Sequence, residues 1–340
     1  MLNFGICFKG DMAVGRTVSL AQRAERAGFT YCWTFDSHVL WKEYNTMIGY
    51  LAGKTDIMRL GPCVTNPGVR DWTVAASHFA ALNVISGGRA VCGVGRGDSS
   101  RRVLGRTPMP VEKMKEFGIF VKKMAEGGRV EYEGKEQWFP WANPDYKLPM
   151  WVAGYGPKVL RSAGTYADGI ILQIADVELC KWFISQVHEG ARSVGRDPSQ
   201  IKIMAAAPVW ISKDKAECRR HVKWFPAMVG NHVADIVKHV VDKDPEQAKH
   251  IPKSLTDYIK GREGYDYRQH ADKDSDHLKF ISDEIVDGFC IVGTVEEHIA
   301  KLRALRAVGV DQFNMYCMFD DEERIVEQYC TEILFEVNKW

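Results

Sequence analysis

The stretch Pro149-Met-Trp-Val-Ala-Gly-Tyr-Gly-Pro-Lys158 joins a short apolar run to a segment with helical spacing that begins at Val159. At such a junction the first N–H groups of the helix have no partner inside the helix, and the helix dipole places positive charge there. Glycine lets the backbone come close to a ligand, and proline suits the first helical turn. The stretch therefore predicts either a plain strand-to-helix turn or a phosphate site.

Two common nucleotide-binding motifs do not explain this stretch. The spacing GxxxxGK[ST] of the P-loop is missing, and the third glycine of the dinucleotide motif GxGxxG is missing as well. The choice between a turn and an anion site therefore depends on the rest of the chain.

Short apolar runs with few charges alternate with segments of helical spacing along the 340 residues. Such runs are typical of buried parallel strands. They cover residues 2–7, 31–35, 59–65, 90–94, 149–153, 169–173, 201–209 and 312–317. Eight strand–helix units predict a single (β/α)8 TIM barrel domain over residues 1–340, and a doubly wound open sheet is the alternative.

Residues 212–287 interrupt the alternation after the seventh strand with a long, mostly polar segment of helical character. Long loops that follow barrel strands often cover the active site. We predict a mainly helical insertion that is either a lid over the mouth of the barrel or a peripheral hairpin used for contacts between subunits.

Charge and composition exclude several classes of partner. Lys and Arg number 45 against 44 Asp and Glu, which argues against binding of nucleic acid. No apolar run reaches the roughly 20 residues of a membrane span, and the first residues lack the form of a signal peptide, so we expect a cytoplasmic protein. The nine cysteines contain no CxxC and the ten histidines no HExxH, so we expect no metal.

Polar side chains gather after the strands, where the C-terminal mouth of a barrel would be. Asp36, Ser37, His38 and Trp41 follow the second strand. Other polar or glycine-rich segments follow the third, fourth and sixth strands, at residues 65–66, 93–100 and 173–176, and the eighth strand carries Asn314 and Tyr316. Each residue alone has a structural explanation, such as a loop cap for Asp36 or a hydrogen-bonded structural role for His38. Their convergence on one mouth predicts an active site there.

Several of these motifs together resemble the bacterial luciferase-like superfamily of flavin- and deazaflavin-dependent oxidoreductases, over nearly the full length. The matching segments are Ala27-Gly-Phe-Thr-Tyr-Cys-Trp33 with Asp36-Ser-His38, Leu60-Gly-Pro-Cys-Val-Thr-Asn-Pro67, and Trp151-Val-Ala-Gly-Tyr-Gly-Pro-Lys158. Phe35-Asp-Ser-His-Val-Leu-Trp41 and Gly95-Arg-Gly-Asp-Ser-Ser-Arg-Arg102 are more closely similar to a subgroup described as coenzyme F420-dependent oxidoreductases.

The resemblance implies a barrel that holds the ring of the cofactor at the strand ends. It places a non-prolyl cis peptide bond, Cys63–Val64, against the ring. The implied cofactor-binding residues are Cys63, Val64, Thr65 and Asn66 at the ring, Gly95, Arg96, Gly97 and Asp98 at its polar edge, and Gly154, Tyr155, Gly156, Pro157 and Lys158 at the phosphate.

The resemblance also implies catalytic residues. His38 would donate or accept a proton near the ring, Asp36 would orient it, and Trp41 would form an apolar wall. In the deazaflavin-dependent relatives a histidine commonly follows the aspartate directly, whereas Ser37 stands between them here.

Three functions are compatible with these motifs. We expect an FMN-dependent monooxygenase that acts on a small organic molecule, with a separate flavin reductase as a partner. The alternative is coenzyme F420-dependent hydride transfer, and a non-catalytic flavin-binding protein is the third possibility. The family resemblance further implies a homodimer or a higher homo-oligomer.

Overall fold

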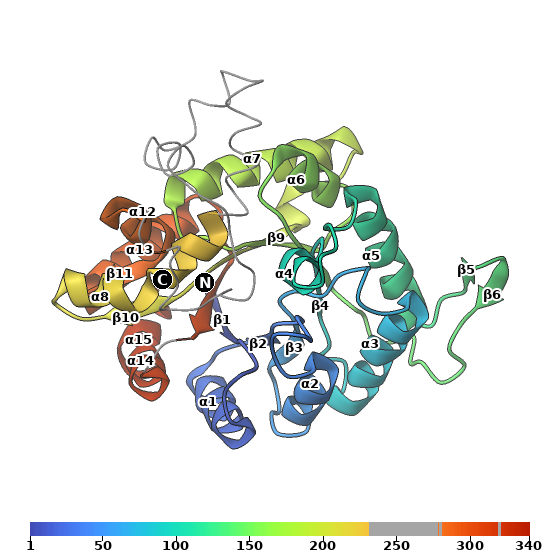
Figure 1. Cartoon of the computed structure of the whole chain (residues 1–340), viewed down its shortest axis with the longest axis horizontal. Coiled ribbons are helices and arrows are strands. Elements are labelled where there is room, and N and C mark those ends of the chain that lie inside the picture. Colours follow the sequence, from blue (N-terminus) through green and yellow to red (C-terminus); the bar gives the residue numbers. More distant parts are fainter. Residues whose placement is uncertain (231–277, 279–280, 319–320) are drawn as a thin grey trace.

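The computed structural model describes residues 1–230, 278, 281–318 and 321–340. In these residues eight parallel strands form the central barrel, and helices surround it (Figure 1). The barrel strands are β1 (Asn3–Phe8), β2 (Tyr31–Thr34), β3 (Arg59–Pro62), β4 (Cys92–Val94), β7 (Met150–Ala153), β8 (Gly169–Leu172), β9 (Lys202–Ala207) and β12 (Gln312–Cys317).

The strands follow the order β3-β2-β1-β12-β9-β8-β7-β4, and all neighbours pair in parallel. Two isolated bridges, Leu60 with Ala90 and Thr65 with Val94, join the β3 side to the β4 side. These bridges bring the two edges of the sheet together. The predicted (β/α)8 barrel is confirmed, and the open doubly wound sheet is excluded.

The helices form because each has an apolar stripe to bury against the barrel. In α1 (Val14–Ala27), Leu20, Ala21 and Ala24 are buried, and Gly28 ends the helix with a left-handed φ of 105°. The helices that follow are α3 (Trp72–Ser86), α5 (Val111–Ala125), α6 (Pro157–Gly164), α7 (Val177–Ser193) and α13 (Val295–Ala307), then α14 (Glu322–Gln328), a π-helical turn (Tyr329–Ile333) and α15 (Leu334–Val337).

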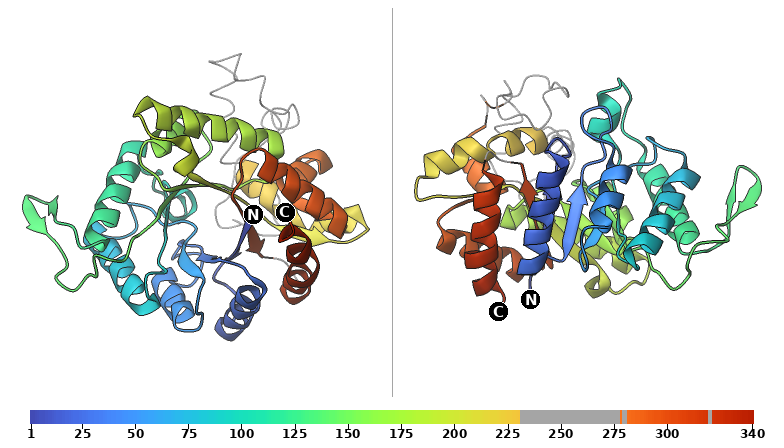
Figure 2. Two further views of the ribbon diagram at one scale, coloured as in Figure 1. Left: turned by 180° about the vertical axis from the view of Figure 1, so that it is seen from behind. Right: turned by 90° about the horizontal axis from the view of Figure 1, so that it is seen from below.

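Three smaller elements complete the described part of the N-terminal half. Helices α2 (Tyr44–Ala52) and α4 (Asp98–Arg102) lie in segments that the sequence pattern did not mark as helical. Strands β5 (Val130–Tyr132) and β6 (Lys135–Gln137) pair in an antiparallel hairpin, which projects away from the barrel (Figure 2). No helix in the described residues is both long and apolar enough to cross a membrane.

The predicted seventh strand, residues 201–209, divides at Pro208. Proline lacks an N–H group, so the barrel ladder of β9 ends at Ala207, and β10 (Val209–Ile211) pairs instead with β11 (Ile291–Gly293). Helices α8 (Lys215–Val222) and α12 (Asp283–Phe289) lie between these two strands in the chain. Most of the predicted 212–287 insertion, including 231–277, lies outside the described residues, so its role as a lid or a hairpin stays a prediction.

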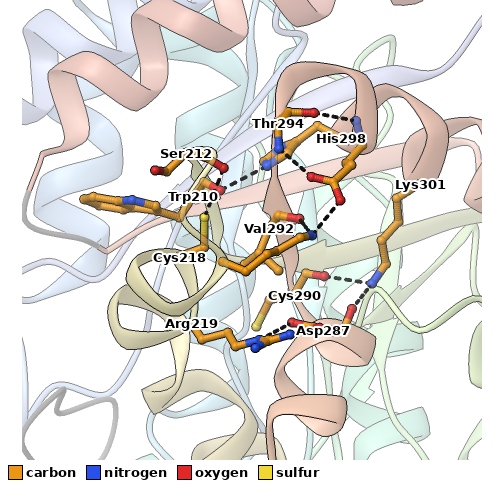
Figure 3. A network of polar contacts seen from close by, with 12 residues as sticks. Trp210, Ser212, Cys218, Arg219, Asp287, Cys290, Val292, Thr294, His298 and Lys301 are labelled. Atoms are coloured by element: carbon orange, nitrogen blue, oxygen red, sulfur yellow. Dashed lines mark hydrogen bonds and ion pairs between the residues drawn. The ribbon is translucent and has the colours of Figure 1, made fainter.

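Buried polar groups hold the base of this insertion against α13 (Figure 3). The imidazole of His298 donates from Nε2 to the carbonyl of Trp210 at 3.1 Å, and its Nδ1 accepts from the hydroxyl of Tyr329 at 2.9 Å. Lys301 donates to three carbonyls at the end of α12, those of Asp287, Gly288 and Cys290. The contacts with Trp210 and Tyr329 fix the His298 ring as the neutral Nε2–H tautomer.

We expect His298 to make the protein acid-sensitive. Burial lowers the pKa of His298 to about 3, against roughly 6.5 in an unfolded chain. Below pH 6.5 the unfolded chain therefore takes up a proton that the folded chain does not. The free energy of unfolding should fall by about 1.4 kcal/mol per pH unit from this residue as the pH drops from 6.5 toward 3.

Urea unfolding at a series of pH values tests this expectation. His298→Gln removes the titrating group and keeps an amide for the same neighbours. The slope of its free energy of unfolding against pH should therefore be smaller by the equivalent of about one proton. His78 serves as an internal reference, because burial also lowers its pKa, to about 4, and it titrates in both proteins. Identical pH slopes in the two proteins would contradict the assignment.

Candidate active site at the mouth of the barrel

A cavity of about 230 Å³ opens at the C-terminal ends of the barrel strands. This volume far exceeds the roughly 10–15 Å³ that a single water needs, so the cavity has room for a ring system. Ten of the predicted site residues line it, namely Asp36, Trp41, Cys63, Val64, Gly95, Arg96, Gly97, Asp98, Gly154 and Tyr155. The structure thus brings together residues from the loops after β2, β3, β4 and β7.

Two predicted residues, Thr65 and Asn66, are buried behind the cavity wall. The hydroxyl of Thr65 donates to Asp36 Oδ2 at 2.6 Å, and the amide of Asn66 donates to the hydroxyl of Ser100 at 2.9 Å. Both partners line the cavity. Thr65 and Asn66 therefore support the wall and do not form its surface.

The predicted phosphate loop ends beside the cavity. Gly156 is the N-cap of α6 with no side-chain cap, and Pro157 occupies the first turn. Lys158 is exposed, and these three residues are not part of the lining. The uncapped backbone N–H groups and the adjacent ammonium fit an anion at this end of the site.

His38 is the predicted catalytic residue that does not line the cavity. It is exposed and does not line the cavity, whereas Ser37 before it does. The backbone N–H groups of Leu40 and Trp41 both donate to the carbonyl of Ser37, at 2.9 and 3.0 Å, which closes a tight turn. Ser37 and Trp41 lie at the cavity on either side of this turn. The predicted role of His38 as a proton carrier at the ring is therefore not supported by its position.

Asp36 has a different partner from the predicted one. Its carboxylate accepts two hydrogen bonds from the guanidinium of Arg70, at 2.5 and 2.9 Å, in addition to the one from Thr65. Arg70 also contacts Glu43 at 2.7 Å. Asp36 is almost fully buried, so this bidentate pair compensates a charge that water cannot reach. Nothing in the spacing of residues 36 and 70 indicated this pair.

The peptide bond between Cys63 and Val64 is cis, as the resemblance implies. Gly95 lies against it, because a Cβ built on Gly95 would stand only 2.7 Å from Val64 Cγ2. A glycine at this position therefore lets the loop after β4 approach the bulge after β3 closely.

Two hydrogen-bonded groups lie at the mouth, where their positions after strands placed them, but the sequence assigned them no role. The hydroxyls of Ser37 and Ser99 lie 2.8 Å apart and connect the β2 loop to α4. The amide of Gln173, just after β8, accepts from the hydroxyl of Tyr155 and donates to that of Tyr316. Serine and glutamine are common on surfaces, so their types alone gave no signal beyond their place after strands.

The cavity combines what a planar cofactor with a phosphate requires. Its lining includes small residues such as Ala153 and Gly154 and the contacting aromatic residues Phe35 and Trp41, and the uncapped start of α6 follows Tyr155 of the lining. Among the described residues there is no group of three or more potential metal ligands. The residues present therefore fit a flavin-type group.

The fold and the cavity define a (β/α)8 barrel with a cavity for a small molecule at the strand ends. The chain belongs to the luciferase-like monooxygenase family, whose sequence model matches residues 3–312. It is an oxidoreductase of that family.

Known proteins similar to the chain include reductases and dehydrogenases. A 5,10-methylenetetrahydromethanopterin reductase of Archaeoglobus fulgidus is 29% identical over 322 residues, which is 92% of each chain. An F420-dependent hydroxymycolic acid dehydrogenase of Mycobacterium tuberculosis is 28% identical over 62% of each chain. The solved coenzyme F420-dependent tetrahydromethanopterin reductase of Methanopyrus kandleri is 25% identical, with a TM-score of 0.77 over 98% of this chain and 99% of that one.

Proposed function

We propose that the protein is a coenzyme F420-dependent oxidoreductase that moves a hydride between the deazaflavin and a small organic substrate. The observation that carries this proposal is the full-length similarity to an F420-dependent reductase, in both sequence and structure. F420-dependent hydride transfer is thus better supported than FMN-dependent monooxygenation, which rests on the description of the family.

The two ends of the cofactor would lie at different loops. The loop from Gly154 to Lys158 would hold the phosphate, and the Cys63–Val64 bulge and the Gly95–Asp98 loop would hold the ring. When bound, a deazaflavin supplies a carbon that donates or accepts hydride. The protein contributes the orientation of the two reactants and the exclusion of water.

The residues of the chain divide this work. The Asp36–Arg70 pair fixes the start of the β2 loop, and Phe35 and Trp41 give an apolar wall. Between the Ser37 and Ser99 oxygens only one of two hydroxyl protons is shared, so the other can be donated to an oxygen or nitrogen of the substrate. This hydroxyl pair would do at the cavity wall what the sequence analysis assigned to His38.

Parallel titrations with F420 and FMN test the proposal. We expect the purified protein to quench F420 fluorescence at much lower concentrations than it quenches that of FMN. We also expect the reduced F420 complex to be stable in air and to be oxidised by an accepted carbonyl or imine substrate. Tighter binding of FMN together with oxygen consumption would favour a monooxygenase, and binding of FMN without any turnover would favour a non-catalytic protein.

We also propose that the chain forms a dimer through the outer face of α2 and α3, which pack side by side. Neither helix contains Asp, Glu, Lys or Arg. Yet Val74, Val84 and Ile85 of α3 are 53%, 50% and 63% exposed, and Tyr50 of α2 is 48% exposed. In a two-fold interface each surface meets its own copy, so helices without charged residues can pair with themselves, with Lys54 Nζ over the Tyr50 ring at the edge of the face. A second copy is therefore the partner that we propose.

Light scattering of a double variant tests this interface. Val74→Glu with Ile85→Glu places carboxylates on both copies of the face, and we expect a monomer where the natural chain gives a dimer. Val14→Glu is the control, because Val14 is an exposed valine on α1, 36% accessible and outside the face. A natural chain that is monomeric at micromolar concentration, or a double variant that remains dimeric, would contradict the interface.

A further inference from the structure

Gln173 connects two cofactor loops across the interior of the barrel. The hydroxyl of Tyr155, in the phosphate loop, donates to Gln173 Oε1 at 2.5 Å, and Gln173 Nε2 donates to the hydroxyl of Tyr316 at 2.6 Å. The hydroxyl of Tyr316 lies 3.8 Å from Cys63 Sγ, which belongs to the cis peptide bond. We call these four side chains the amide chain.

The amide chain crosses the barrel instead of following its wall. Gln173 follows β8 and Tyr316 lies on β12, two strands that are separated by β9. Cys63 follows β3, which β1 and β2 separate from β12. Backbone pairing through β4 links β3 to β7 on one side of the barrel, and these side chains add a second connection between Tyr155 and Cys63 across its interior.

The amide chain has a fixed direction, and its other members are buried on either side of the half-buried Gln173. Tyr316 is fully buried, while Tyr155 and Cys63 are 8% and 2% exposed. A carbonyl oxygen can only accept, so the Tyr155 hydroxyl must donate to Gln173, and the amide nitrogen must donate to Tyr316. A glutamine serves both neighbours at once. A leucine would serve neither, and a glutamate could only accept from both.

We infer that Gln173 is a positioning residue that holds the phosphate loop and the cis-peptide bulge at the separation that the cofactor needs. The inference rests on the proposed function, because these loops meet one ligand only if the cavity holds the deazaflavin. It assigns two distinct parts to the amide chain: the Tyr155 half fixes the phosphate end, and the Tyr316 half fixes Cys63 beside the ring.

Two measurements on the full-length protein separate these parts. One is the dissociation constant for F420 from fluorescence quenching. The other is the alkylation rate of Cys63 in the cofactor-free protein, followed by peptide mass spectrometry. Gln173→Leu should weaken F420 binding about tenfold, as expected for the loss of an ordinary hydrogen bond or two, and should speed alkylation of Cys63 several-fold.

Variants that break only one of the two hydrogen bonds of Gln173 give the decisive pattern. Tyr155→Phe should weaken F420 binding and leave alkylation of Cys63 unchanged, whereas Tyr316→Phe should speed the alkylation. Gln173→Glu keeps the bond from Tyr155 but turns the Tyr316 hydroxyl away from Cys63, so its alkylation should resemble that of Tyr316→Phe. Gln186→Leu is the control, because Gln186 is a buried amide on α7 outside the cavity lining.

The outcomes distinguish this inference from the proposed function. If the natural chain binds F420 and Gln173→Leu changes neither measurement, the positioning role is wrong and the proposed function stands. If the natural chain does not bind F420, the proposed function fails. Faster alkylation in Gln173→Leu would then still support a link between Gln173 and the bulge, and an unchanged rate would remove that link too.

Discussion

Arg70→Met is expected to lower the free energy of unfolding by about 3–5 kcal/mol, because it leaves the Asp36 carboxylate buried without a counter-charge. The side chain of Asp36 is fully buried, and that of Arg70 is only 16% exposed. The same variant should lose most of its affinity for the cofactor, since Asp36 lines the cavity. Urea unfolding monitored by circular dichroism, together with F420 titration, measures both effects.

A second variant separates the ion pair from general damage to the loop. Asp36→Asn combined with Arg70→Met removes both charges, so it should recover a large part of the lost stability without recovering the natural geometry. If the double variant is as unstable as the sum of the two single variants, the two side chains act independently, and their pairing is not what stabilises this loop.

Gly97→Ala is expected to cost roughly 2–5 kcal/mol of stability. Gly97 has a φ of 79°, where an L-residue pays about 1–2 kcal/mol. A Cβ there would also stand 2.5 Å from Asn66 Cγ. Asn66 cannot easily move, because it donates to Ser100 and accepts from the backbone N–H of Gly68. Overpacking of this kind adds about 1–3 kcal/mol.

Gly105→Ala is the matched control for Gly97→Ala. Gly105 also has a positive φ, 71°, but a Cβ there would meet nothing within 4 Å. Thermal unfolding of the two variants should therefore differ by the steric cost alone. F420 binding should weaken only in Gly97→Ala, because Gly97 lines the cavity and Gly105 does not. Equal losses in both variants would show that the backbone conformation, and not Asn66, determines the cost.

The barrel could be predicted from the sequence because each strand is marked by a short, continuous run of apolar residues. Each barrel strand is complete within three to six residues, as in β8, where Gly169–Leu172 are all buried. Pro208 shows the limit of such signals. It lies inside an apolar run, and only the position of β11 reveals that the chain leaves the barrel after Ala207.

The sequence predicted which loops form the candidate site better than it predicted which of their residues face the cavity. Residues from Gly95 to Asp98 line the cavity together with Cys63 and Val64, and the Cys63–Val64 bond is cis, as the resemblance implied. Which side chain of a loop faces the cavity depends on the local turn, and the turn closed by the Ser37 carbonyl places His38 outside. The Asp36–Arg70 contact joins residues far apart in the sequence, so neither periodicity nor spacing could indicate it.

The parallel pairing of β10 with β11 has a consequence for how this protein can be altered. Ile211 lies beside Gly293, so the chain leaves the barrel and returns to it at neighbouring points. The entropy of closing a loop between fixed neighbouring ends grows only with the logarithm of its length. The length of the intervening segment can therefore change at little cost, provided that Phe225, which packs against Tyr316, and Met228, which lines the cavity, are kept.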